Sequence, residues 1–339
     1  MDNAPKTAKV LLVEDNKINL EVALEILEPL ALDIDTASDG KKAIEKITQN
    51  SYEFVFMDYL MPVLDGAEAT KAIRQAGFDE NILPIVALTA ANEDVELLLS
   101  CGMNDVLIKP LSLEKAKAML QKYLPSKAAD FEESCSSVST EKESEDSLPE
   151  IPGIDTSLAM EHCSSASMVH KMWHDFASIA EYKTEEISAL LRNSNINSFR
   201  IEIHALKSSA NLIGAVSLSK KFESLEAMAK ANDVAELQKA TPLVLVDYLS
   251  LKKMILAVLN DAPKEQIEVP TNSIEALLDQ LIGAANDMFL DGVDESLAEL
   301  ERCILPPEVS SDFEKLKYYV FEVNLTEAVK IAETLKEKL

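Results

Sequence analysis

Short apolar runs alternate with amphipathic segments between Val10 and Leu124, and this alternation constrains the fold more than any other feature. The five runs that predict strands are KVLLVED, DIDTAS, FVFMD, PIVALTA and DVLIKP. The segments between them, such as INLEVALEILEPL and GKKAIEKITQN, have apolar residues at helical spacing. Strands that alternate with helices build a parallel sheet covered on both faces. We therefore expect an α/β doubly wound, five-stranded parallel sheet in residues 1–124.

The rest of the chain has a different character. Residues 125–150 contain seven serines and eight acidic residues, a composition that cannot bury enough apolar surface to fold, so a flexible linker is predicted there. Residues 151–262 show long helical patterns without strand signals, which favours an all-α helix bundle. A second break at 263–272 carries two prolines and predicts another linker. It separates a small C-terminal helical segment, residues 273–339, whose sequence assigns it no role.

Size and hydropathy limit the cellular setting. A chain of 339 residues exceeds what one hydrophobic core usually supports, so several domains are expected. The longest uncharged apolar run, ILPIVALTAA, is about half the length that crosses a bilayer, and no membrane span is predicted. The N-terminal segment holds a four-residue apolar run, too short for the core of a signal peptide. We expect a cytoplasmic protein.

Charge and composition exclude several functions. The net charge of −27, from 59 acidic and 32 basic residues, repels nucleic acid and anionic membranes. The eight glycines form no glycine-rich phosphate cradle, so any phosphoryl group must come from another protein. The four cysteines are scattered without a C-x-x-C pair, which predicts reduced thiols rather than disulfides or a zinc site.

Polar side chains follow four of the predicted strands. They are Glu14, Asp15, Asp58, Thr89 and Lys109. The carboxyl ends of parallel strands meet at one edge of a sheet, so these side chains should converge. Clustered carboxylates repel one another, and Mg²⁺ would relieve this repulsion while leaving positions for phosphate oxygens. Asp58 would then accept a phosphoryl group, with Lys109 neutralising its oxygens. For each residue alone, the alternative is a solvated loop tip of an acidic protein.

A second candidate site lies in the helical half, in the stretch HALKSSANLIGA. Helical periodicity gives that helix one buried stripe, formed by Phe199, Ile203, Leu206, Ala210 and Ile213. His204 falls roughly 140° from this stripe and is predicted to face solvent beside Arg200, Lys207 and Ser208. Neighbouring cations favour a phosphoryl group over a divalent metal, so a phosphohistidine is the hypothesis. No carboxylate and serine nucleophile accompany His204 in the sequence, so a hydrolase triad is not supported.

The other three histidines, His162, His170 and His174, are interpreted as exposed residues on charged faces without a function. His170 and His174 share one helical face, yet no third ligand follows at a suitable spacing for zinc. His162 has no such partner.

Residues 8–124 resemble a response-regulator receiver domain, because LLVEDN, MDYLMPVLDG, ALTA and IKP match that family's blocks in order. The resemblance implies that Asp58 is the phosphoacceptor and that Thr89 and Lys109 contact the phosphoryl oxygens. It also implies that Glu14 and Asp15 hold Mg²⁺ together with Asp58 and the Leu60 carbonyl. The Lys109–Pro110 peptide bond is expected to be cis.

Three positions depart from the receiver pattern. Val106 stands where the family normally has a switch aromatic, which argues against output by rotation of a ring. Leu60 and Ala91 flank the path of the hydrolytic water, and neither side chain can hold that water by a hydrogen bond. A long-lived aspartyl phosphate on Asp58 is therefore the hypothesis.

The segment from Pro152 to Asn260 resembles histidine phosphotransfer domains. HALKSSANLIGA follows that family's motif, with Gly214 and Ala215 in place and IPGID as lead-in. The resemblance implies that His204 carries the phosphoryl group and that Lys207 contacts it. Ser208 replaces the usual first glycine of the motif.

The two resemblances together imply the middle of a multistep phosphorelay, as in the C-terminal part of hybrid sensor histidine kinases. An upstream sensor kinase would phosphorylate Asp58, and His204 would pass the group to a downstream response regulator or drain one by the reverse path. Transfer within one chain and transfer between chains both stay open. The competing hypothesis is a non-catalytic, phosphorylation-dependent adaptor or phosphate sink.

Overall fold

The structure is a computed structural model that describes residues 8–89, 95–127, 131, 148–163, 165–259, 270–286, 289–321 and 324–339. Most of the predicted linker at 125–150 lies outside the described residues, and so does most of the break at 263–272. Both linkers therefore stay predictions. The chain divides into two compact units, one containing Met1–Trp173 and Leu190–Val244, the other containing His174–Ala189 and Leu245–Leu339.

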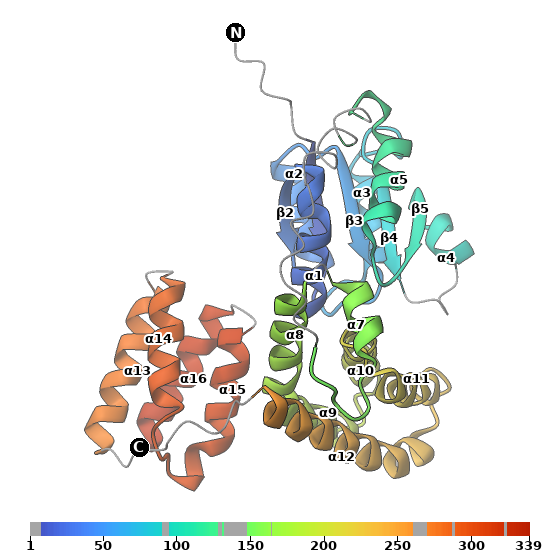
Figure 1. Ribbon diagram of the computed structural model, residues 1–339. Coiled ribbons are helices and arrows are strands. Elements are labelled where there is room, and N and C mark those ends of the chain that lie inside the picture. The colour runs from blue at the N-terminus through green and yellow to red at the C-terminus, as the bar shows by residue number, and fades with distance from the viewer. Residues whose placement is uncertain are drawn as a thin grey trace. The chain divides into compact units, whose positions relative to one another are not determined.

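The first unit contains the predicted sheet (Figure 1). Its strands are β1 (Lys9–Val13), β2 (Asp33–Ala37), β3 (Phe54–Asp58), β4 (Ile85–Thr89) and β5 (Asp105–Ile108). They pair in the order β2-β1-β3-β4-β5, and every pair is parallel. The predicted fold class is thus confirmed. The central strands β3 and β4 are buried along their whole length, as expected for strands covered on both faces.

Successive side chains of each strand pack into two separate cores, because the side chains of a strand point alternately to the two faces of the sheet. Leu11 and Val13 pack with α2 (Gly40–Gln49), α3 (Gly66–Gln75) and α4 (Val95–Ser100). Val10 and Leu12 pack with α1 (Lys17–Leu27) and α5 (Leu113–Tyr123) on the opposite face. Short 3-10 turns, η1 (Glu28–Leu30) and η2 (Pro125–Lys127), follow α1 and α5.

The turn after β3 depends on a glycine at position 66. A Cβ atom on Gly66 would lie 2.1 Å from the backbone oxygen of Asp58, closer than any real contact. The Gly66 amide donates to the Tyr59 carbonyl at 2.8 Å, and Asp65 caps α3 by accepting from the Glu68 amide at 2.8 Å. This close turn holds the carboxyl end of β3, where Asp58 lies, in a fixed position.

All described elements after the linker are helical. The first of them are α7 (Thr156–His162), α8 (Ala166–Ser178), α9 (Ala180–Arg192), α10 (Ile196–Leu212), α11 (Val216–Lys230) and α12 (Val234–Val258). Helices α7, α10 and α11 belong to the first unit, whereas α8, α9 and α12 have residues in both units. The predicted limits of the 151–262 block therefore stay a prediction. The buried stripe predicted for α10 is confirmed, since all five of its residues are 0 or 1% exposed.

The glycine of the LIGA sequence joins α10 to the lead-in of the helical part. Gly214 has φ of +83°, and a Cβ atom there would lie 2.3 Å from the Asp155 carbonyl oxygen. The Asp155 amide donates to the Gly214 carbonyl at 2.9 Å. Beside this contact, the indole Nε1 of Trp173 donates to the Ile213 carbonyl at 3.1 Å. The IPGID and LIGA sequences, about 60 residues apart, are thus in direct contact.

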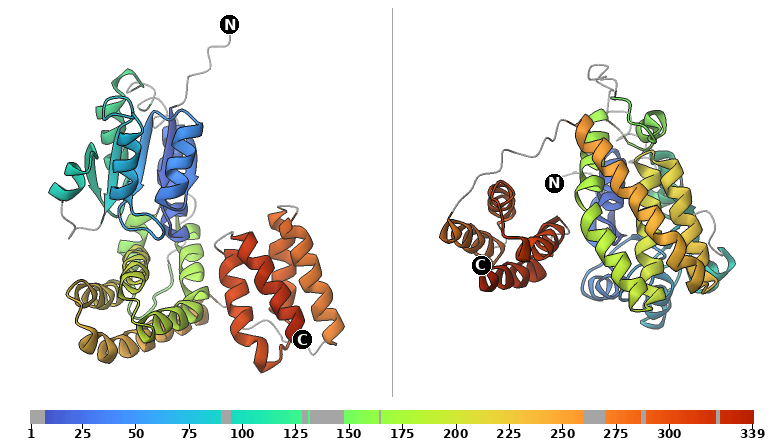
Figure 2. Two further views of the ribbon diagram at one scale, coloured as in Figure 1. Left: turned by 180° about the vertical axis from the view of Figure 1, so that it is seen from behind. Right: turned by 90° about the horizontal axis from the view of Figure 1, so that it is seen from below.

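The second unit ends in four helices with a core of their own (Figure 2). They are α13 (Thr271–Asn286), α14 (Leu290–Leu300), α15 (Ser310–Phe321) and α16 (Leu325–Lys338), with a short 3-10 turn, η3 (Pro307–Val309), before α15. Leu281, Leu300, Leu316 and Ala332, one from each helix, are fully buried together. The helical segment predicted for 273–339 is confirmed.

In the described part of the chain, no helix combines the length and the apolar character needed to cross a bilayer. Cys101, Cys163 and Cys303 are free thiols, as predicted, while Cys135 lies outside the described residues.

The replacement Gly214→Ala is expected to destabilise the helical part by about 2–4 kcal/mol, because it adds a steric clash to the cost of a positive φ. Gly153→Ala is the matched control: Gly153 also has a positive φ, of +91°, but nothing lies within 4 Å of its Cβ position. The control should cost about 1–2 kcal/mol. Thermal unfolding followed by fluorescence of Trp173, the chain's single tryptophan, measures both. Equal losses in the two variants would contradict the role of the Asp155 contact.

Candidate functional site

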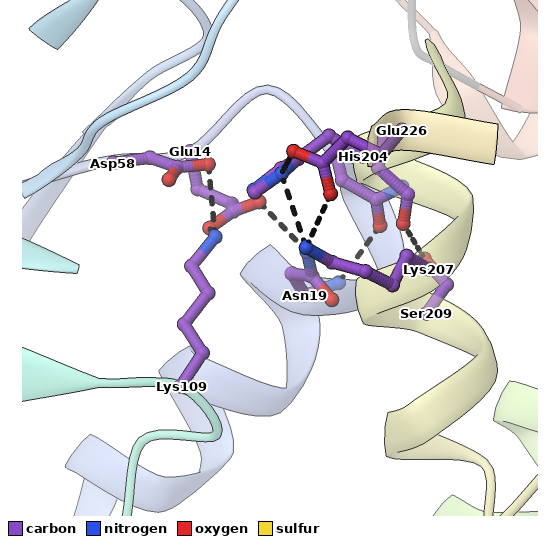
Figure 3. A network of polar contacts seen from close by, with 10 residues as sticks. Glu14, Asn19, Asp58, Lys109, His204, Lys207, Ser209 and Glu226 are labelled. Atoms are coloured by element: carbon purple, nitrogen blue, oxygen red, sulfur yellow. Dashed lines mark hydrogen bonds and ion pairs between the residues drawn. The ribbon is translucent and has the colours of Figure 1, made fainter. Parts of the chain in front are cut away.

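The predicted acidic pocket lies at the carboxyl edge of the sheet (Figure 3). Glu14 follows β1, and Asp58 and Thr89 are the last residues of β3 and β4. The Lys109 amide, just after β5, donates to the Thr89 carbonyl at 2.7 Å. The parallel register therefore brings together side chains that are up to 95 positions apart in the sequence.

Lys109 connects the carboxylates of this pocket. Its ammonium nitrogen lies 2.6 Å from Glu14 Oε2 and 2.8 Å from Asp58 Oδ2. The Asp58 side chain is only 2% exposed, and its second oxygen, Oδ1, is buried without a hydrogen-bond partner in the described structure. A buried, unpartnered carboxylate oxygen is costly, so its presence points to a group that binds there in the working protein.

Burial and mutual repulsion shift the ionisation of the pocket. Burial raises the pKa of Asp58 to about 7, helped by the negative charge of Glu14 and opposed by Lys109. Burial likewise raises the pKa of Asp15 well above its usual range, and Asp58 and Glu14 add to the shift. Burial alone would lower the pKa of Lys109, but Asp58 and Glu14 more than compensate and raise it. The pocket is therefore short of positive charge.

The donor set fits a hard divalent cation. Glu14, Asp15 and Asp58 each offer one carboxylate oxygen, and these oxygens lie within 4.8 Å of one another. Oxygen ligands from a few carboxylates are what Mg²⁺ prefers, with its remaining positions left to water or phosphate. Together with the unpartnered Asp58 oxygen, this geometry fits the predicted magnesium site.

The remaining receiver residues are placed as follows. Thr89 is buried at the pocket edge, and Leu60 lies in the turn directly after β3. The roles of Thr89 and of the Leu60 carbonyl stay predictions. The Lys109–Pro110 bond is cis, as predicted. Ala91 lies outside the described residues.

The predicted solvent exposure of His204 is wrong, because its side chain is only 4% exposed. Helical periodicity correctly puts His204 off the buried stripe of α10, but it does not reveal what covers the opposite side. Glu226 of α11 lies against the ring, and Figure 3 shows the ring also pointing toward the side of Glu14 and Asp58. The histidine is thus buried by neighbouring segments rather than by the stripe of its own helix.

Glu226 is the functional residue that sequence reasoning missed. Its Oε1 lies 3.0 Å from His204 Nδ1, and its Oε2 accepts from the Lys207 ammonium at 2.6 Å. The expectation that no carboxylate accompanies His204 is therefore wrong. The available signal was an acidic residue beside the apolar stripe of α11, between Phe222 and Ala229, where a buried charge needs a partner.

This arrangement leaves one imidazole nitrogen ready to react. Hydrogen bonds and ion pairs to His204 and Lys207 lower the pKa of Glu226 against the opposing effect of burial, so its carboxylate is ionised and can only accept. Nδ1 of His204 therefore carries the hydrogen, and Nε2 keeps its lone pair. Burial lowers the pKa of His204 below its ordinary value, which keeps the ring neutral at pH 7 even though the Glu226 bond opposes this shift.

Helix α10 lies against the sheet-containing part of the same unit. It packs against α1, and Lys171 of α8 pairs with Glu21 of α1 at 2.7 Å. Glu14 and Lys109 of the pocket line one cavity with Lys207, which lies one helical turn after His204. The histidine and the acidic pocket are therefore neighbours within this unit.

A cavity of about 260 Å³ is lined by residues of the sheet-containing part and of α10 and α11. Its polar lining includes Glu14, Asn19, Lys109, Lys207, Ser208 and Asn211. Ser208 thus lines a cavity that Glu14 and Lys109 of the pocket also line.

The other histidines do not form a metal site among the described residues. In that part of the chain, the group whose atoms lie close enough to hold one metal ion is formed by Glu14, Asp15 and Asp58. His174 lies beside Asp175, His170 packs against Trp173, and His162 Nδ1 lies 3.1 Å from the Leu212 carbonyl. His170 is not fully exposed, since its Nε2 is buried. The absence of a function for these three residues stays a prediction.

Comparison with known proteins identifies the domain family of the sheet-containing part. Residues 10–121 match the model of the response regulator receiver domain. Histidine kinase 5 of Arabidopsis thaliana is 39% identical over 143 residues, which cover 34% of this chain and 16% of that protein. The aerobic respiration control sensor protein ArcB of Escherichia coli K12 is 36% identical over 162 residues, covering 47% of this chain and 20% of ArcB. The chain thus spans a fifth or less of the length of these relatives.

A solved structure is similar over the same part. The receiver domain of the sensor histidine kinase PA1611 from Pseudomonas aeruginosa PAO1, crystallised with magnesium in its active-site cleft, is 36% identical. The match has a TM-score of 0.33 and covers 35% of this chain and 98% of that one.

Residues 10–121 of this chain are therefore a response regulator receiver domain, a class of domain that signals through a phosphoryl group accepted on an aspartate. Its relatives include a histidine kinase and a sensor protein.

The replacement Glu226→Ala should lower the free energy of unfolding of the helical part by about 2–4 kcal/mol, because it leaves the buried Lys207 ammonium without its carboxylate. Glu226→Gln keeps the hydrogen-bond acceptor and should lose less. Denaturant titration read by Trp173 fluorescence measures the change. Ser224→Ala, an exposed position on the same helix, is the control and should change stability by less than about 0.5 kcal/mol. A Glu226→Ala variant as stable as this control would contradict the pairing.

Proposed function

We propose that this chain is a phosphorelay protein that receives a phosphoryl group on Asp58 and transfers it to His204. The observation that carries this proposal is the placement of the His204 ring, with a neutral Nε2, beside the acidic pocket of the receiver domain. An upstream sensor histidine kinase supplies the group, and a separate response regulator accepts it from His204.

In the first step, an oxygen of Asp58 attacks the phosphorus of a phosphohistidine on the kinase. An O–P bond forms at Asp58, and the N–P bond to the kinase histidine breaks. Lys109, 2.8 Å from Asp58 Oδ2, supplies positive charge close to the incoming phosphoryl oxygens. When Mg²⁺ is bound, Glu14, Asp15 and Asp58 would hold it, and it would neutralise phosphoryl oxygens.

In the second step, Nε2 of His204 attacks the same phosphorus, and the O–P bond to Asp58 breaks to release a free carboxylate. The Nδ1 hydrogen stays in the bond with Glu226, whose negative charge balances the positive charge that the ring develops. Lys207, paired with Glu226 at 2.6 Å, is held where it can contact the phosphoryl oxygens. Both steps are reversible, so the same residues can also drain a phosphorylated regulator.

The contact of α10 with α1 supports transfer within one chain. The Lys171–Glu21 ion pair and the packing of α10 against α1 keep the donor and acceptor segments together, which raises their effective concentration.

Phosphorylation by a cognate kinase, or by acetyl phosphate, is expected to yield an acid-labile, base-stable phosphate on wild-type protein. Asp58→Asn should block its arrival and His204→Gln should abolish it. If transfer occurs within one chain, an equimolar mixture of the two variants should form phosphohistidine at least about tenfold more slowly than the wild type at the same concentration.

The controls separate the possible outcomes. Chelation of divalent cations should prevent phosphorylation of Asp58 in every variant. His170→Gln, a change at a histidine outside the site, should behave as wild type. Recovery of the wild-type rate in the mixture would contradict transfer in cis, and the absence of phosphohistidine from all samples would contradict the relay in favour of an adaptor or sink.

The aspartyl phosphate on Asp58 is expected to persist for minutes or longer in His204→Gln, because the Leu60 side chain cannot hold a hydrolytic water by a hydrogen bond. Leu60→Asn adds an amide that can, and should shorten the lifetime several-fold. Phosphate release from the purified, phosphorylated variants measures both rates. A lifetime of seconds in His204→Gln would refute this expectation.

A further inference from the structure

A cluster of aromatic side chains joins α15 to α9 within the second unit. We define this tyrosine clasp as Tyr182 and Lys183 of α9 with Tyr318 and Tyr319 of α15. The rings of Tyr182 and Tyr318 are stacked, with centroids 4.0 Å apart and planes 13° from parallel. Tyr319 lies edge-on to Tyr318 at 5.5 Å and tilted against Tyr182 at 6.3 Å.

A buried ammonium group lies at the centre of the clasp. The Lys183 side chain is 8% exposed, and its nitrogen donates to the Tyr318 hydroxyl at 2.9 Å and pairs with Glu186 at 3.0 Å. The same nitrogen lies 4.5 Å from the centre of the Tyr318 ring, within range of a cation–π interaction. A buried lysine is stabilised only when its charge is compensated, so Tyr318 and Glu186 act together on it.

The α13–α16 helices do not need this contact to form a core. Their apolar core is built from residues of those four helices and of the turn between α14 and α15, and Tyr318 is not among them. Tyr319, one position further along α15, packs against this core instead. Consecutive helical residues point about 100° apart, so one tyrosine anchors α15 in its own core while the other reaches α9.

The chemistry of the contact is that of an interface rather than of a domain interior. Tyrosine presents an apolar ring and a polar hydroxyl, which makes it common at the centre of protein interfaces and acceptable to water when the interface opens. A hydrogen bond from Ser311 to Glu185, at 3.3 Å, adds a polar contact beside the aromatic one.

We propose that the α13–α16 module is a detachable docking module that covers the α9 surface of its own chain through the tyrosine clasp. Tyr318 is the anchor, and Lys183 with Tyr182 forms its receptor on α9. The module leaves α9 without unfolding, because Tyr318, the anchor of the clasp, is not part of the module's core. This inference is independent of phosphoryl transfer and gives the C-terminal helices a binding partner.

Amide hydrogen exchange of the full chain tests the proposal. Tyr318→Ala and Tyr182→Ala should each speed exchange in residues 180–189 at least about fivefold, because the docked helix loses its cover. Exchange within the cores of α13 and α16 should change less than about twofold, since the module stays folded. Tyr318→Phe keeps the stacked ring but loses the acceptor for Lys183, so it should give an intermediate effect.

Ile304→Ala, a truncation of an exposed apolar side chain in the same module, is the matched control and should leave residues 180–189 unchanged. Three results would overturn the proposal. Exchange in residues 180–189 could stay at the wild-type rate in both alanine variants. It could rise only together with exchange throughout α13–α16, which would mean unfolding. Protection that weakens on dilution of the wild type would assign the docking to a second copy of the chain.

Discussion

The acidic pocket exists because one ammonium group is buried among carboxylates. Lys109 lies within 3 Å of both Glu14 and Asp58, and without it the edge of the sheet would collect buried negative charge that folding could not tolerate. Compensation is incomplete, since the pKa values of Asp15 and Asp58 stay raised and one Asp58 oxygen has no partner among the described groups. The remaining deficit of positive charge suits a site that binds a cation and then a phosphoryl group.

A related balance operates around His204. Glu226 holds the Nδ1 hydrogen and the Lys207 ammonium together, so the buried side chains compensate one another instead of requiring water. The pKa of the ring is lowered by burial and partly restored by Glu226. The result is a nucleophilic ring nitrogen that is neutral and oriented at pH 7. Phosphoryl transfer requires a nitrogen in this state.

The helical half uses polar interactions for different purposes in different places. At Gly214 the backbone itself makes the contact with Asp155, and only a glycine fits. At the tyrosine clasp, rings and a buried lysine join α9 to α15, while Tyr318 stays outside the core of α13–α16. The first contact belongs to the packing of the fold, whereas the second has the composition of an interface that can open.

The sequence by itself determined the helices and strands and the side chains that meet at the edge of the sheet. Periodicity is a local property, so the five strands, the α10 stripe and the helices after position 273 could be predicted, and the convergence of Asp58, Thr89 and Lys109 followed from the geometry of parallel strands. What covers a side chain is not local. Glu226 is 22 residues from His204, and receiver side chains are almost 200 positions away. Only the tertiary structure could decide that His204 is buried, because burial depends on which distant segments pack against it.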